Sequence, residues 1–331
     1  MKEGTKHLVL SRLEREKGSF VSGAMLAKAL HISRNSVWKA VRSLCEDGYE
    51  IESTTGRGYR LKSTSSVLSA ESIERYLSVP NVHVQYHASI DSTNTRAKAL
   101  AQEKAPEGTL IVAGEQTSGR GRQGRAFFSP AGTGVYFSFI VRPKFELGDV
   151  VAITSYTACC LAATFDDLLG CESRIKWVND IFVDGRKVSG ILTEATFDAE
   201  SMSLTSVVVG IGVNVMQPKG GFADDSKEIA GALTDLTEDR DDLRARIVAG
   251  TLNRFMERYE SLPRKPHLAE YRKRSLLVGR RVYVEEHNSS FEATVLGIND
   301  DFTLEVSLED GKTRSLASGE VHIPSSQLQV C

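Results

Sequence analysis

The sequence predicts an α+β protein with several domains, and three observations support this prediction. Helix-period patterns and a short hairpin open the chain, mixed helix and strand patterns occupy its middle, and brief alternating strands close it. The chain has 331 residues, which is too long for one domain of ordinary size. We therefore expect three domains, with the boundaries 1–64, 65–275 and 276–331.

The first domain shows three helix-period patterns followed by a hairpin. The patterns cover residues 6–16, 22–30 and 33–44. Only His31 and Ile32 separate the second and third patterns, and Met25 is among the apolar residues expected to face inward. Two helices joined by so short a turn are typical of a helix-turn-helix, and the hairpin around residues 55–58 predicts the wing of a winged helix.

Charge is distributed unevenly between this domain and the rest of the chain. Residues 1–64 contain 12 Lys and Arg against 7 Asp and Glu, whereas the remainder contains 29 against 36. A basic N-terminal domain joined to an acidic remainder indicates that only the N-terminal domain binds a polyanion. The residues expected to contact DNA are Arg34, Asn35, Ser36, Trp38, Lys39, Arg42 and Arg57. The alternative is a three-helix packing module with a solvated charged face.

Composition excludes several classes of protein. Hydrophobic residues make up 41% and charged residues 25%, as in ordinary globular proteins. The N-terminus lacks the apolar core of a signal peptide, and polar residues interrupt the longest apolar stretch, 150–169, so we expect a buried helix there and no membrane association. Five cysteines without CxxC spacing argue against a disulfide framework or a zinc site and favour a cytoplasmic protein. The seven scattered histidines suggest no metal site.

The middle domain contains an unusual run, Gln116–Pro130, which we call the arginine loop. Its glycines permit close backbone approach, and its arginines match phosphate or carboxylate oxygens, so the loop is expected to grip anions. The GxGxxG pattern within it also fits a dinucleotide fingerprint, but residues 127–130 block the helix that such a site needs. No GK[ST] follows, which excludes a Walker A loop. A disordered basic surface loop remains the alternative.

Other polar clusters stand at the ends of expected strands. Residues 91–94 begin a helix, and their hydroxyl and amide groups suit a neutral polar ligand. The alternative is that they only cap the helix. Residues 176–180 place Lys, Asn and Asp beside an aromatic side chain, and Lys187 follows a tight turn; a solvated charged turn is the alternative for each. Two glycines in the apolar strand 209–214 indicate close approach by another group.

The strand patterns of the middle domain predict a mixed, mostly antiparallel sheet. From Leu277 onward, several short runs separated by turn residues predict a small SH3-like β-barrel.

Taken together, the motifs DSTN, EQTxGRGRxGRxF, KWxND, RKVSGIL and GIGVNV resemble those of biotin protein ligases that carry an N-terminal DNA-binding domain. The resemblance covers nearly the whole chain. It implies a biotin–[acetyl-CoA-carboxylase] ligase that uses ATP and Mg²⁺ to form biotinyl-5′-AMP and transfers biotin to a lysine of a biotin carboxyl carrier domain. It also implies a homodimer, promoted by this adenylate, that binds operator DNA and represses biotin synthesis or transport genes.

The resemblance also implies roles for particular residues. The expected catalytic residues are Lys187, Arg122 and Asp180. The expected biotin-binding residues are Ser92, Thr93, Asn94, Gln116, Gly119, Arg120, Arg122, Lys187 and Gly190. The expected nucleotide-binding residues are Arg120, Arg122, Arg125, Phe127, Lys176, Asn179 and Asn214. Phe127 and Val178 depart from the Trp and Pro that are frequent in the family.

Three rival interpretations stay open at this point. A lipoate-type ligase shares the adenylation chemistry but lacks the GRGRxG pattern. A ligand-sensing transcription factor that has lost catalysis would keep the same pocket. A ligase whose winged helix has no operator would keep the same motifs.

Overall fold

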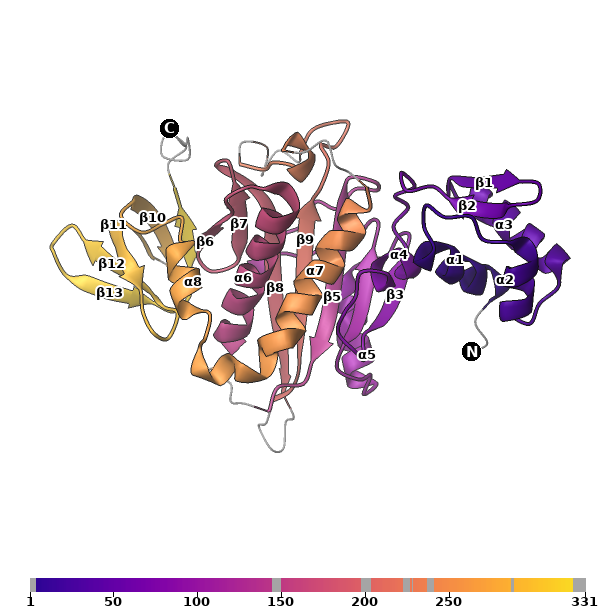
Figure 1. The fold of residues 1–331 in the computed structure, drawn as a ribbon. Coiled ribbons are helices and arrows are strands. Elements are labelled where there is room, and N and C mark those ends of the chain that lie inside the picture. Colours follow the sequence, from indigo (N-terminus) through magenta and orange to yellow (C-terminus); the bar gives the residue numbers. More distant parts are fainter. Residues whose placement is uncertain are drawn as a thin grey trace. The chain divides into compact units, whose positions relative to one another are not determined.

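The computed structural model describes residues 4–144, 150–197, 204–222, 227, 229–236, 241–286 and 289–323 (Figure 1). The chain divides into two compact units. Unit 1 comprises Met1–Ser78 and Glu238–Ala249, and unit 2 comprises Val79–Thr237 and Gly250–Cys331. Within the described part of the chain, none of the helices combines the length and apolar character needed to cross a membrane.

Unit 1 contains the expected helices and hairpin. Its elements are α1 (Thr5–Arg15), α2 (Gly23–Ala29), α3 (Arg34–Glu46), β1 (Ile51–Thr54), β2 (Gly58–Leu61) and α4 (Ala70–Glu74). Ser33 caps α3 by accepting a hydrogen bond from the Ser36 amide at 3.0 Å. Leu13, Leu26 and Leu44 are at most 1% exposed and hold the helices together. Met25, which we expected inside, is 64% exposed, because α2 turns its neighbour Leu26 inward instead.

A buried charged cluster also lies in unit 1. Lys17 Nζ is 2.5 Å from Asp242 Oδ2 and 4.0 Å from Glu14 Oε2, and these three side chains are at most 3% exposed. Arg75 NH1 lies 3.4 Å from the same Asp242 oxygen, and the Tyr76 hydroxyl donates to it at 3.0 Å. Burial raises the pKa of Glu14 to about 7, although Lys17 opposes that shift.

Unit 2 is built on a seven-stranded sheet with the order β3-β4-β5-β9-β8-β7-β6. The strands are β3 (His83–His87), β4 (Thr109–Ala113), β5 (Gly134–Val141), β6 (Arg174–Lys176), β7 (Asp180–Val183), β8 (Arg186–Phe197) and β9 (Leu204–Asn214). Among these ladders only β3–β4 is parallel, so the mostly antiparallel sheet is confirmed. Asp184 and Gly185, which form the tight turn before Lys187, both have positive φ, as a two-residue hairpin turn requires.

Helices cover both faces of this sheet. They are α5 (Thr93–Gln102), α6 (Val150–Leu169), α7 (Leu243–Arg258) and α8 (Leu268–Lys273), with 3-10 turns η1 (Arg122–Gly124), η3 (Leu233–Asp235) and η4 (Tyr259–Arg264). α6 and the part of α7 that belongs to unit 2, from Gly250 on, run across one face (Figure 1), where Phe139 of β5 contacts Phe255 of α7 at 4.9 Å between ring centroids. α5 packs through Ala97 against Ile140 on the opposite face, because alternate strand residues point to opposite sides.

The chain ends in a second antiparallel sheet, ordered β13-β12-β11-β10-β14. Its strands are β10 (Arg281–Glu286), β11 (Ser289–Ile298), β12 (Leu304–Leu308), β13 (Thr313–Leu316) and β14 (Glu320–His322). No ladder joins β13 to β14 within the described residues, so a closed barrel is not confirmed. The indole of Trp177 donates to the Phe302 carbonyl at 2.9 Å and thereby ties this sheet to the central one.

Candidate functional site

A cavity of about 270 Å³ opens in unit 2, on the α5 side of the central sheet. Of the predicted site residues, it is lined by Ser92, Thr93, Asn94, Gln116, Arg120, Arg122, Arg125, Phe127, Lys176, Asn179, Asp180, Lys187 and Gly190. All five motifs, which are far apart in the sequence, therefore meet at one pocket, since Gly210 and Gly212 of GIGVNV line it as well. The exceptions are Gly119, whose Cα faces the Phe127 carbonyl at the loop's base, and Asn214, which pairs with Gly134 at the end of β9.

One end of the pocket is neutral and polar. Thr93 donates to Gln116 Oε1 from its amide at 2.8 Å and from its hydroxyl at 3.1 Å. Ser138 on β5 donates to Asn94 Oδ1 at 2.6 Å and lies 2.8 Å from the Thr93 hydroxyl. Ser92 caps α5 at its buried N-terminus. These groups offer donors and acceptors without net charge, as an uncharged polar ring requires.

Two glycines of β9 let other groups pack against the strand. A Cβ on Gly210 would lie 1.8 Å from Asn94 Oδ1, and one on Gly212 would lie 2.4 Å from the Phe127 ring. The close approach predicted from this strand is confirmed, since a side chain at either position would collide with a pocket residue.

The arginine loop folds back on itself beside this pocket. Phe127 donates its amide to the Gly119 carbonyl at 2.9 Å, and Gly121 donates to the Arg125 carbonyl at 2.7 Å. Its three arginines contact three separate parts of unit 2. Arg122 donates to Asn179 Oδ1 at 3.2 Å, Arg120 lies 3.6 Å from Glu194, and Arg125 pairs with Glu320. The loop is thus an ordered part of the pocket wall.

The opposite end of the pocket is charged. Lys187 Nζ on β8 lies 2.7 Å from Asp180 Oδ2 on β7, where the two strands pair. Burial lowers the pKa of Lys176, although the nearby Asp180 opposes the shift. Burial raises the pKa of Glu194, but hydrogen bonds from Lys98 and Asn94 outweigh burial and leave it below its usual value. Of the charged residues that line the pocket, five are the cations Arg120, Arg122, Arg125, Lys176 and Lys187, and two are the carboxylates Asp180 and Glu320.

The sequence analysis missed three acidic or basic residues near this pocket. Glu320 and His322 of β14 line it, and Glu194 of β8 binds Asn94 and Arg120. The carboxylate at position 194 follows the RKVSGIL motif closely, which is a local signal. No local signal marks Glu320 or His322, because strand pairing in the C-terminal sheet brings them to the pocket.

The predicted DNA-binding residues belong to α3, except for Arg57, which lies in the turn between β1 and β2. Arg34, Asn35, Trp38, Lys39, Arg42 and Arg57 are exposed, whereas Ser36 is half-buried and bonds to Ser33. Trp38 is 49% exposed, and the Arg42 guanidinium lies 5.7 Å from its ring centroid. Arg57 at the hairpin tip stacks on Phe20 at 4.0 Å. An exposed cationic helix beside a basic hairpin is the arrangement of a winged helix.

Comparison with known proteins connects both surfaces to one family. Residues 5–60 match an HTH domain, and residues 86–214 match the Biotin/lipoate A/B protein ligase family. The chain is 36% identical over 297 residues to the bifunctional ligase/repressor BirA of Bacillus subtilis (strain 168), covering 88% of this chain and 90% of that protein. The chain belongs to the bifunctional ligase/repressor family.

Two further relatives cover 99% and 73% of the chain. It is 27% identical over 331 residues to the bifunctional ligase/repressor BirA of Escherichia coli (strain K12), covering 99% of this chain and 100% of that one. A biotin protein ligase from Aquifex aeolicus, solved in complex with biotin and ATP, superposes with a TM-score of 0.61 at 26% identity, covering 73% of this chain and 98% of that chain. The ligase fold is therefore shared by unit 2.

Proposed function

We propose that this ligase/repressor condenses biotin with ATP to biotinyl-5′-AMP, transfers the biotinyl group to a lysine of a biotin carboxyl carrier domain, and represses genes of biotin supply. The observation that carries the proposal is the polarity of the pocket, which runs from the neutral groups of Thr93 and Gln116 to the cations Arg122 and Lys187. Biotin has a neutral ureido ring at one end and a carboxylate at the other, so it matches this gradient.

In the first step, a biotin carboxylate oxygen attacks the α-phosphorus of ATP, and the bond to the leaving pyrophosphate breaks. Two anions have to meet, so cations are needed at the junction. Lys187 and Arg122 lie where they can offset this charge, while Arg120, Arg125, Lys176 and Asn179 would hold the nucleotide. Mg²⁺ would enter as part of the MgATP substrate, bound to the oxygens of the triphosphate.

In the second step, the amine of the acceptor lysine attacks the acyl carbon, and AMP leaves. The ordinary pKa of a lysine is about 10.4, so the amine has to lose a proton first. We assign Asp180 to accept or orient that proton. The arginine loop would exclude water from the anhydride while Arg122 stays bound to Asn179.

For repression, the adenylate would favour a two-fold dimer that presents two α3 helices to a palindromic operator. The exposed cations of α3 and the β1–β2 hairpin support this role. The proposal also includes a cytoplasmic location, the domain boundaries 1–64, 65–275 and 276–331, and an SH3-like arrangement of the last domain.

The decisive experiment measures pyrophosphate release from ATP with biotin, with lipoate and with neither acid. Biotin-dependent release supports the ligase, lipoate-dependent release indicates the lipoate-type rival, and no release indicates a sensor that has lost catalysis. Operator binding is measured separately with and without biotin plus ATP. Equal affinity in both conditions would remove ligand-controlled repression and leave the ligase intact.

A further inference from the structure

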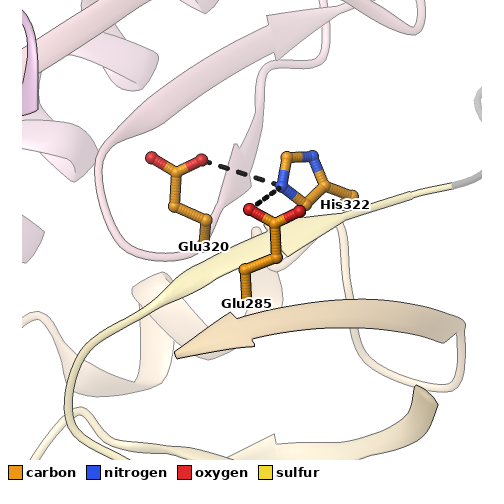
Figure 2. Close-up of side chains that lie close together, drawn as sticks. All are labelled: Glu285, Glu320 and His322. Atoms are coloured by element: carbon orange, nitrogen blue, oxygen red, sulfur yellow. Dashed lines mark ion pairs between the residues drawn. The ribbon is translucent and has the colours of Figure 1, made fainter. Parts of the chain in front are cut away.

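Three potential metal ligands converge on the C-terminal sheet (Figure 2). They are Glu285 of β10 and Glu320 and His322 of β14, and the nearest ligand atoms of all three lie within 4.8 Å of one another. His322 Nε2 is 3.6 Å from Glu285 Oε2 and 3.7 Å from Glu320 Oε2. Figure 2 shows both carboxylates directed at this single nitrogen. The three groups thus surround one point in space.

Hydrogen bonding does not account for this arrangement. Separations of 3.6 and 3.7 Å exceed a normal N–H···O hydrogen bond. His322 Nε2 is buried at the atom level and has no hydrogen-bond partner within the described residues. In contrast, ligands that share a metal ion at about 2.0–2.2 Å each lie roughly 3–3.6 Å apart, close to the observed values.

The register of the sheet adds an independent reason for a cation here. Glu285 and Glu320 are direct cross-strand partners in the β10–β14 ladder. Like charges placed directly opposite on neighbouring strands destabilise a sheet. Arg125 contacts Glu320 from the arginine loop, but no cationic partner of Glu285 other than the His322 ring is seen in the described ranges. A bound cation between the two carboxylates would relieve the repulsion.

We propose that Glu285, Glu320 and His322 bind a divalent first-row transition-metal ion, with Zn²⁺ as the representative. The imidazole nitrogen favours such an ion, because Mg²⁺ and Ca²⁺ prefer sites made only of oxygens. Three protein ligands leave a coordination position open. Glu320 and His322 also line the pocket, so this position is accessible from the cavity.

The site would couple metal binding to the arginine loop. Glu320 Oε2 contacts the Arg125 guanidinium and also lies 3.7 Å from His322 Nε2. A metal ion bound to Glu320 Oε2 would therefore compete with Arg125 for this oxygen. Metal binding would therefore release Arg125 from the C-terminal sheet. The proposal does not depend on ligase activity, since its first readout is binding of the metal alone.

The test titrates Zn²⁺ into the full-length chain against a chromogenic chelator. Cys45 is an exposed thiol and therefore a competing ligand for zinc, so a Cys45→Ser background is used. We expect one Zn²⁺ per chain, with affinity lowered at least about tenfold by His322→Ala and by Glu285→Gln. Glu286→Gln is the matched control, because Glu286 is the next residue on β10 and pairs with Arg314 instead. His322 and Glu285 are half-exposed, so we expect both variants to fold, and thermal unfolding of each variant checks this.

Co²⁺ provides a second readout, because a nitrogen ligand and low coordination number give visible absorption bands that His322→Ala should remove. The proposal is overturned if Zn²⁺ binds with the same affinity after His322→Ala, or if the chain binds no Zn²⁺. Displacement of Zn²⁺ by Mg²⁺ at similar concentration would likewise contradict a site with a nitrogen ligand.

Discussion

Lys187 Nζ lies 2.7 Å from Asp180 Oδ2, so the cation proposed for adenylation is paired with the carboxylate proposed for transfer. Each step can be tested through one member of this pair. Lys187→Met keeps the length of the side chain but removes its charge. We expect pyrophosphate release to fall about 10²–10³-fold, as for the loss of one preorganised charge at a reaction centre. Lys28→Met, at an exposed position in unit 1, should retain the wild-type rate.

Asp180→Asn should separate the two steps. We expect transfer from purified biotinyl-adenylate to a carrier domain to slow by about 10²–10⁴-fold, the usual contribution of a general base, with adenylation affected less. The measurement is the mass shift of the carrier in single turnover. Asp184→Asn is the control, since Asn tolerates the positive φ of that turn residue. Transfer at the normal rate by Asp180→Asn would exclude the assigned role.

Arg122→Ala should shorten the lifetime of the bound adenylate. The variant loses the 3.2 Å hydrogen bond to Asn179 and one charge near the phosphate. A charged hydrogen bond contributes about 1.5–3 kcal/mol, so release of radiolabelled adenylate should accelerate by roughly tenfold or more. Arg264→Ala, at an exposed position in η4, should leave release unchanged. The loop does not retain the adenylate if both variants release it at the same rate.

Gly212→Ala should destabilise the ligase unit, because the new Cβ would approach the Phe127 ring to 2.4 Å. Overpacking of this kind costs about 1–3 kcal/mol in the free energy of unfolding. Adding Phe127→Ala should recover part of that loss, and urea unfolding of the four chains of a double-mutant cycle measures the recovery. Gly297→Ala has open space around its Cβ and should stay within about 0.5 kcal/mol of wild type. Additive losses would mean that the ring does not cause the strain.

Glu14 should make unit 1 more stable in mild acid. Its folded-state pKa of about 7 lies above the usual 4.5, so its contribution is fully present below about pH 4.5 and is lost as the pH rises through 7. Over this range the change is on the order of 1–3 kcal/mol. Glu14→Gln should flatten the pH dependence of amide exchange in α1, whereas Glu16→Gln, at a partly exposed position, should not. An unchanged slope after Glu14→Gln would contradict the raised pKa.

Local sequence patterns were sufficient for most elements and for much of the pocket. Ser33 caps α3 at the start of the third helix-period pattern, and residues from 92 to 190 meet at one cavity because their motifs stand where strands end. The pairing of strands that are far apart in the sequence could not be predicted from local patterns. Glu320 and His322 reach the pocket through the register of β14, which no neighbouring residue encodes. The inward position predicted for Met25 was wrong, because adjacent residues of a helix do not point in the same direction and tertiary packing buries Leu26.

The wall formed by Glu320 and His322 has a consequence for inhibitor discovery. Compounds built only on the vitamin and the nucleotide would address the groups assigned to adenylation, from Thr93 to Lys187. A basic or metal-binding substituent extended toward the C-terminal sheet would meet a carboxylate and an imidazole as well. This edge therefore offers an inhibitor additional contacts that do not involve the residues assigned to catalysis.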